Sequence, residues 1–179
     1  VSNVGLKILL DQVNQREDAL AERAYAPWLD MEALMRENGI PLYALESKRP
    51  LACFDLIGFT LPYETLYTNA LNVLNLAGIP VRSADRDETH PIIIAGGHST
   101  MNPEPMHAFI DAFVIGEGEE VIHDIINTIS SLRAERSNPQ HNEEIASGYR
   151  PRNDVLRELA KIPGVYVPTF YKTSYLDDG

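Results

Sequence analysis

The sequence predicts a three-layer α/β fold in which helices cover both faces of a mainly parallel sheet. Two apolar runs, at residues 91–95 and 112–115, have the length of buried strands, and each leads through glycine into a helix signal. Apolar stripes with helical spacing, at 65–77 and 119–132, follow strand-like runs. Strands and helices that alternate in this way form parallel sheets through right-handed crossovers.

The first part of the chain predicts a helix and then a short strand. Apolar residues between positions 4 and 13 recur around one helical stripe. Residues 21–25 then have the length and composition of a strand, which Pro27 ends.

A second helix is expected to begin at Asp30 and to stop at Gly39. An aspartate side chain can accept a hydrogen bond from the first helical turn, and glycine suits the left-handed residue that follows a helix. The apolar residues expected on its buried face are Met31, Leu34 and Met35.

The middle of the chain predicts two more strands and the helix that follows them. Residues 42–45 are expected to form a short edge strand and residues 55–59 a central one. The helix at 65–77 is expected to end at Gly78.

The expected fold lacks its first strand in the chain as given. A doubly wound domain normally opens with a strand, whereas residues 4–13 predict a helix at the start. In the flavodoxin-type, Rossmann-like strand order 2-1-3-4-5, the first strand lies inside the sheet. We therefore expect a strand before Val1 in the full-length protein, and a groove between the 21–25 and 55–59 strands where it is missing.

Composition predicts one soluble domain with no nucleic-acid or membrane partner. The chain has 179 residues, 44% of them hydrophobic, and a net charge of −11 that repels phosphate backbones and anionic lipid. It contains neither an apolar stretch of membrane-spanning length nor a secretion signal in Val1 to Gly5, so a cytoplasmic location is expected. The oligomeric state stays open.

The chain divides into three parts by composition. Residues 1–132 are the α/β domain, and residues 133–152 are a polar linker or excursion rich in Glu, Arg, Ser, Asn and Pro. Residues 153–179 begin with a short helix at 153–160 and continue as an extended segment bounded by Pro163 and Pro168. This last part is expected to lead into a further domain.

Glycines cluster where the predicted strands end. Gly96 and Gly97 follow one strand, and the sequence Gly116-Glu117-Gly118-Glu119 follows the next. In open α/β sheets ligands bind at this edge, where glycine permits a close approach of the backbone and a helix N-terminus favours anionic groups. Tight turns in any doubly wound protein need the same glycines, and carboxylates at a helix start complement its dipole.

The order of these motifs resembles the cobalamin-binding domain that precedes the catalytic domain in many radical S-adenosylmethionine (radical SAM) proteins. The motifs are Gly96-Gly97, then Pro103-Glu104-Pro105, then Asp111 through Glu120. Residues 24–32 and 54–65 are similar to a poorly characterised bacterial subfamily of this group. The resemblance extends from residue 1 to about residue 171.

The resemblance implies a cobalamin site without its usual cobalt ligand. Ser2 occupies the position of the histidine that binds cobalt in the best-understood domains of this kind, and Thr60-Leu61-Pro62 aligns with their Ser-x-Leu motif. Either cobalamin binds with no side chain of this domain on cobalt, or the domain keeps the fold and has lost the cofactor. The cofactor-binding residues that the resemblance implies are Gly5, Thr60, Leu61, Gly96, Gly97, Gly116, Glu117 and Gly118.

Catalysis is expected in another domain. In the family that the chain resembles, a 4Fe-4S cluster held by three cysteines cleaves S-adenosylmethionine in a separate barrel, and cobalamin often serves methyl transfer. Cys53 is the single cysteine here, so no catalytic residue or iron–sulfur ligand set is assigned to this chain. The five histidines lack metal-site spacing, and no metal site is predicted. The expected partner is the C-terminal radical SAM domain of the same protein; the alternative is a structural module with the same fold and no cofactor.

Overall fold

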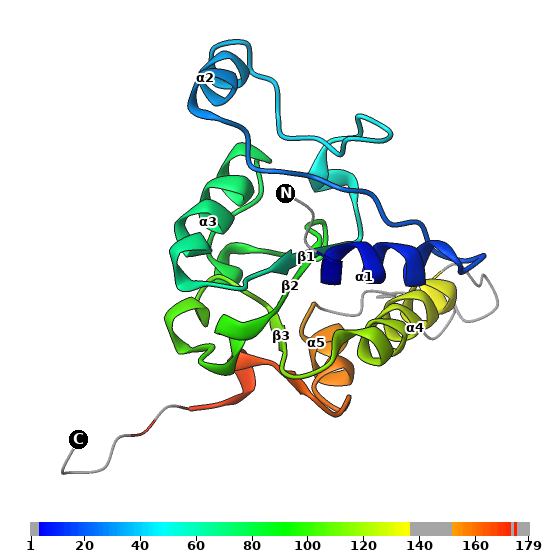
Figure 1. The fold of residues 1–179 in the computed structure, drawn as a ribbon. Helices are drawn as coiled ribbons and strands as arrows, with labels where there is room; N and C mark the ends of the chain where they lie inside the picture. Colours follow the sequence, from blue (N-terminus) through cyan, green and yellow to red (C-terminus); the bar gives the residue numbers. More distant parts are fainter. Residues whose placement is uncertain (1–3, 137–151, 173, 175–179) are drawn as a thin grey trace.

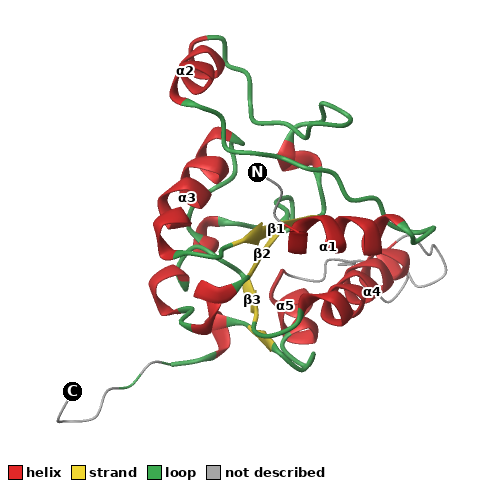
Figure 2. Cartoon of the chain, in the orientation of Figure 1, coloured by secondary structure: helices red, strands yellow, loops and turns green. Residues whose placement is uncertain are grey.

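The computed structural model describes residues 4–136, 152–172 and 174, and these form an α/β domain around a four-stranded sheet. The strands stand in chain order across the sheet (Figure 2): β1 (Leu56–Thr60), β2 (Ile92–Gly96), β3 (Ala112–Val114) and β4 (Val165–Tyr166). The first three run parallel, and β4 pairs antiparallel with β3. The parallel pairing expected for the strands at 91–95 and 112–115 is confirmed.

Two apolar cores lie on opposite faces of the sheet, which explains why β2 is an unbroken apolar run. Ile93 and Phe113 point into a core covered by α3 (Tyr67–Leu76), while Ile92 and Ile94 point into a core covered by α4 (Gly118–Arg136) and α5 (Arg152–Leu159). Figure 1 shows α3 on one side of the strands and α4 and α5 on the other. A strand that is covered on both faces has apolar side chains at successive positions, so apolar and polar residues do not alternate along it.

Helix α1 (Val4–Asn14) packs beside α4 on the outer part of the second face (Figure 1). Arg16, just after α1, donates hydrogen bonds to the Asn127 side chain of α4 at 2.6 Å and to Asp18. Only Val13 of α1 is buried. The helix is therefore present as predicted, but it covers little of the core.

Helix α2 (Leu29–Glu37) stands away from the sheet, beside α3 (Figure 1). Arg36 donates to the side chains of Asn72 and Asn75, both at 2.9 Å. Of the three apolar residues expected on its buried face, Met35 is buried, but Met31 and Leu34 are 43% and 56% exposed.

The start of α2 also differs from the prediction. Trp28 is the residue before the first turn, and Asp30 lies inside that turn, where its carboxylate accepts from the Met31 amide at 2.8 Å. The stop at Gly39 is confirmed, since Gly39 adopts a φ of +62°. Likewise, α3 ends before Gly78, whose φ is +70°.

Two predicted strands are wrong. Residues 21–25 belong to no strand; the Arg23 amide and carbonyl instead bond the Glu46 carboxylate at 2.8 Å and the Leu45 amide at 2.7 Å. Residues 42–45 contribute only an isolated bridge between Tyr43 and Pro50. Neither segment has a neighbouring strand among the described residues with which to form a ladder, so their local strand preference has no effect.

The end of the described chain adds to the sheet. The predicted helix at 153–160 is α5, and the proline-bounded segment contains β4, which pairs Val165 with Val114. Leu156, Leu159 and Val167 are fully or almost fully buried in the second core. Most of the predicted linker, at 133–152, lies outside the described residues.

Candidate binding edge and the pocket beside β1

The carboxyl ends of the three parallel strands lie together at one edge of the sheet. The register places Thr60 beside Gly96 and Gly96 beside Val114. The structure thus brings Thr60, Leu61, Gly96 and Gly97 into one place, with Gly116 and Glu117 in the loop after β3 and Gly118 at the start of α4. Gly5 lies in the first turn of α1, next to Leu6, which lines the same pocket as Thr60 and Leu61.

Gly97 serves close packing of the chain on itself. Its φ is +111°, and a Cβ at this position would lie 2.9 Å from the carbonyl oxygen of Leu61. A Cβ on Gly96 would instead meet Val114 at 3.8 Å, an ordinary van der Waals distance. The glycine requirement therefore lies at Gly97, and the space that its missing side chain leaves is filled by the backbone of Leu61.

Hydrogen bonds close this part of the edge further. The Ser99 hydroxyl and amide both donate to the Leu61 carbonyl, at 2.6 and 3.1 Å, and Thr100 donates to the carbonyls of Gly97 and Val114. Ser99 and Thr100 are 4% and 1% exposed. The Ser99 hydroxyl joins the loop after β2 to the loop after β1, and the Thr100 hydroxyl joins it to β3.

The loop after β3 is more open. Gly116 adopts a φ of +112°, and a Cβ there would have no atom within 4 Å. Glu117 is exposed, while a Cβ on Gly118 would lie 3.5 Å from the Leu9 side chain of α1. Glu119 and Glu120 occupy the first turn of α4, where carboxylates complement the helix dipole.

The four histidines of the described residues are His90, His98, His107 and His123. Among the described residues no three His, Cys, Asp or Glu side chains are grouped so as to hold a metal ion. His90 lies 2.7 Å from Asp87, and His123 lies 3.0 Å from Gln12. His98 is exposed at the carboxyl edge, and His141 lies outside the described residues.

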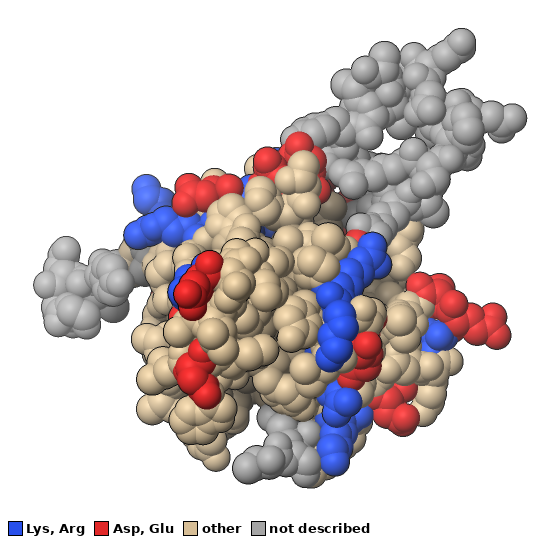
Figure 3. All heavy atoms as spheres, turned by 90° about the horizontal axis from the view of Figure 1, so that it is seen from above, with Lys and Arg blue, Asp and Glu red and all other residues tan. Residues whose placement is uncertain are grey.

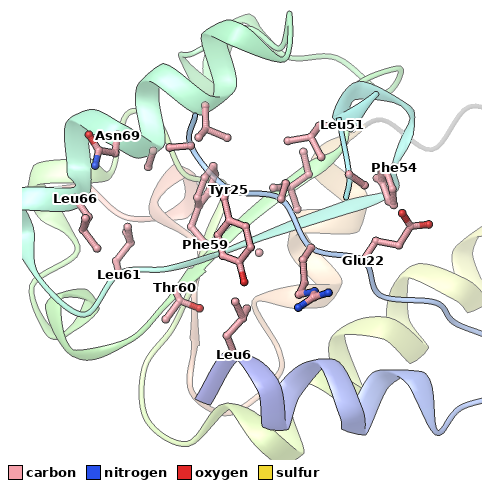
Figure 4. A pocket seen from close by; sticks show the side chains of 18 of the residues that line it. Leu6, Glu22, Tyr25, Leu51, Phe54, Phe59, Thr60, Leu61, Leu66 and Asn69 are labelled. Atoms are coloured by element: carbon pink, nitrogen blue, oxygen red, sulfur yellow. The ribbon is translucent and has the colours of Figure 1, made fainter. Parts of the chain in front are cut away.

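A pocket of about 360 Å³ lies beside β1, and we call it the β1 pocket. One wall is β1 itself, a second is the extended segment 22–26, and a third is formed by residues of α3 (Figure 4). Leu6 of α1 closes the end near Thr60. The lining is mostly apolar, and its charged side chains are Glu22 and Arg23. The sequence predicted a groove at this place.

The charged groups at the β1 pocket are engaged elsewhere. Arg23 forms an ion pair with Glu46 at 2.7 Å, which raises the pKa of the guanidinium, and Glu22 accepts from the Ser47 amide. Both side chains therefore fasten the segment 22–26 to residues 46–47. The side of segment 22–26 that faces β1 therefore presents backbone and apolar groups.

A buried ion cluster lies at the amino ends of β2 and β3 and was missed from sequence. The Asp111 carboxylate is 1% exposed and accepts at one oxygen, Oδ2, from Arg86 at 2.9 Å, from Arg152 at 2.5 Å and from the Ile93 amide at 2.7 Å. Burial lowers the pKa of Arg86, while the charge of Asp111 opposes that shift. The only sequence signal was an aspartate directly before the apolar residues of β3.

Surface charge gives no large patch of one sign on the face shown in Figure 3. Basic and acidic side chains are interspersed there around a broad uncharged area. No helix in the described ranges is long and apolar enough to cross a bilayer.

Comparison with known proteins identifies the family. The model of the family "Radical SAM proteins, N-terminal" matches residues 5–168, which is most of the chain. An uncharacterised protein of Methanocaldococcus jannaschii is 32% identical over 95 residues, which cover 51% of this chain and 20% of that protein. No solved structure matches. The chain therefore spans at most a small part of that relative's length, and it belongs to the family of N-terminal domains of radical SAM proteins.

Proposed function

We propose that this chain is a non-catalytic N-terminal domain of a cytoplasmic radical SAM iron–sulfur enzyme. The observation that carries the proposal is the family match together with a single cysteine, Cys53, in the whole sequence. An iron–sulfur cluster needs several cysteine thiolates. Cys53 is exposed in a turn before β1, at the amino end of the sheet. The cluster, S-adenosylmethionine and the reaction therefore belong to another domain of the full-length protein.

The carboxyl edge is the surface that we propose contacts the catalytic domain. Tyr63 follows β1 and Met101 follows β2, and both side chains are 67% exposed although they are large and apolar. His98 is exposed between them in the chain. Large apolar side chains rimmed by polar groups are typical of protein contacts. The relative from Methanocaldococcus is about five times longer than its matched segment, which leaves room for such a partner within one chain.

Cobalamin fits this edge only in part. A cofactor that lay on Gly96 and Gly97 would need the space that the Leu61 backbone fills, and the hydroxyls of Ser99 and Thr100 are already engaged with carbonyl groups. Ser2 lies outside the described residues. We derive no catalytic step through cobalamin. The contact with the catalytic domain is therefore the proposed role, and cobalamin binding is the second candidate.

One observation favours the second candidate. Gly116 has a glycine-only backbone conformation in open space, beside the exposed Glu117 and the N-terminus of α4. Such a loop can accept a ligand without displacing any part of the chain. Methyl transfer is the reaction that this candidate implies for the full-length enzyme.

The domain contact is tested in the full-length protein purified without oxygen. Tyr63→Glu and Met101→Glu should lower the rate of S-adenosylmethionine cleavage and increase proteolysis between the domains, because a carboxylate replaces apolar area in the contact. Leu20→Glu is the control, since Leu20 is 73% exposed in the loop after α1. Equal activity of all three variants would contradict the proposed contact. Cys53→Ser should leave the iron content unchanged.

The second candidate has a separate test. Absorbance of the full-length protein after incubation with hydroxocobalamin and gel filtration measures retained corrinoid. No retention rejects cobalamin and leaves the domain contact intact. Retention that Gly116→Val abolishes and that Gly78→Val preserves supports a site in the loop after β3; Gly78 is the matched control because it also has positive φ in open space.

A further inference from the structure

Among the described strands, β1 lies at one edge of the sheet, and no other described strand pairs with its outer side. The Asp55 carbonyl accepts from Ile92 at 3.0 Å and the Leu61 amide donates to Gly96 at 2.7 Å, so odd-numbered residues direct their backbone groups toward β2. Backbone groups alternate in direction along a parallel strand. Leu56, Gly58 and Thr60 therefore direct their amides and carbonyls away from β2, toward the β1 pocket.

The opposite wall of the β1 pocket presents unpaired backbone as well. Segment 22–26 is joined to residues 45–47 on its outer side through Arg23. The backbone groups of Ala24 and Ala26 form no hydrogen bond with any other described residue. Two extended stretches thus face each other across an apolar pocket, each with unpaired donors and acceptors (Figure 4). Unpaired backbone groups along an extended segment are a template for another strand, and an added strand is the ligand that pairs with them in alternation.

Strand β1 is also poorly covered for a strand at this position. No residue of β1 is fully buried and Gly58 is exposed, whereas four residues of β2 and all of β3 are buried. Glycine within a strand is typical of places where another backbone comes close. At Gly58 a Cβ would touch only the Ile94 side chain, at 3.7 Å, so packing within the described chain does not demand glycine.

We infer that the β1 pocket is the seat of an extended strand that pairs parallel with β1 and is formed by the residues directly before Val1 in the full-length protein. A strand parallel to β1 ends at the carboxyl edge, beside Thr60. The first turns of α1 lie there, because Leu6 lines the pocket with Thr60 and Leu61. Such a strand would continue into α1, and α1 would form the crossover to segment 22–26.

The origin of the strand follows from this connection. A strand from a second molecule could enter in either direction and would need no join to α1. A small molecule could fill the apolar space but could not satisfy alternating donors and acceptors along two chains. The matched relative has most of its length outside the aligned segment, so additional chain is available in proteins of this kind.

The test is amide hydrogen exchange of the full-length protein, read residue by residue. The amides of Ile57 and Phe59 are the internal control, because they bond to β2 in any case. The amides of Gly58 and Thr60 should exchange about as slowly as this control, at least about 100-fold more slowly than in an unstructured peptide. Fast exchange at Gly58 and Thr60, with slow exchange at Ile57 and Phe59, overturns the inference.

A further variant pair and three conditions identify the occupant. Gly58→Pro removes the amide that faces the pocket while Gly58→Ala keeps it, so only Gly58→Pro should release the Thr60 amide to fast exchange. Protection that survives tenfold dilution and extensive dialysis, but is lost when the residues before Val1 are deleted from the full-length protein, supports the inference. Protection lost on dilution assigns the pocket to a second copy, and protection lost on dialysis assigns it to a small molecule; either result overturns the inference.

Discussion

The two edges of the sheet are built in different ways. At the β3 edge, residues 152–166 supply α5 and β4, and Arg152 joins a buried cluster with Asp111 and Arg86. At the β1 edge the neighbouring segment 22–26 stays separate from the strand, and a pocket lies between them. One edge is thus closed by the described chain itself, and the other has the shape of a site for an additional strand.

The two edges differ in how deeply their strands are buried, and this difference decides whether the backbone of an edge strand needs a partner from the protein. Every residue of β3 is buried, and most polar groups around it find their partners within the described chain, although Asp111 Oδ1 and Arg152 Nε have none there. Strand β1 is half-exposed, and water can solvate its outer groups until another strand replaces it. The closed edge should therefore be sensitive to loss of charge, and the open edge to loss of its links to β2.

The largest expected effect is at the closed edge. Asp111→Ala leaves the fully buried guanidinium of Arg86 and that of Arg152 without a carboxylate, which should lower the free energy of unfolding by about 3–5 kcal/mol. Urea unfolding followed by circular dichroism measures the change. Asp154→Ala removes the partner of the exposed Arg157 and is the control, with an expected loss below about 1 kcal/mol. Equal losses would mean that the buried cluster does not hold this edge.

A smaller effect is expected where β1 is joined to β2 at the carboxyl edge. Gly97→Ala combines a φ of +111° with an overlap at the Leu61 carbonyl, and the backbone strain alone should cost about 1–3 kcal/mol. Gly96→Ala is the control, because its Cβ finds ordinary contact with Val114 and should change the free energy of unfolding little. The reverse ranking would show that Gly96 is the restricted position.

The smallest effect is expected from the hydroxyl that supports the same junction. Ser99→Ala removes a buried bond to the Leu61 carbonyl, which still accepts from the Ser99 amide, so the loss should be about 1 kcal/mol. Ser131→Ala removes a comparable bond on the exposed surface of α4 and should be nearly neutral. Unfolding midpoints of both variants, compared in the same denaturant, provide the measurement. Two equal midpoints would show that the Ser99 hydroxyl does not help to hold β1 in place.

At the carboxyl edge, the sequence motifs predicted the positions of the glycines but not their contacts. The sequence located Gly96, Gly97 and Gly116 at the ends of strands, and the structure places them there. It could not tell that Gly97 packs against Leu61, whereas Gly116 faces open space, because these contacts join loops distant in the chain. For the same reason the sequence could not tell that Gly96 is the less restricted of the two neighbouring glycines.

The sequence by itself determined the elements that are long, apolar and periodic. The run of β2 and the helices α3 and α4 follow from side-chain spacing, and Gly39 and Gly78 mark helix ends through their left-handed backbone. Tertiary structure decided the short or partnered elements. Residues 21–25 form no ladder without a neighbour, while two residues of β4 form one because β3 is beside them. Asp111 shows the same division, since an aspartate before a strand acquires its charge partners only when residues 86 and 152 fold against it. A strand pair, like a buried ion cluster, gains its stability from groups far apart in the chain, and local sequence does not contain that information.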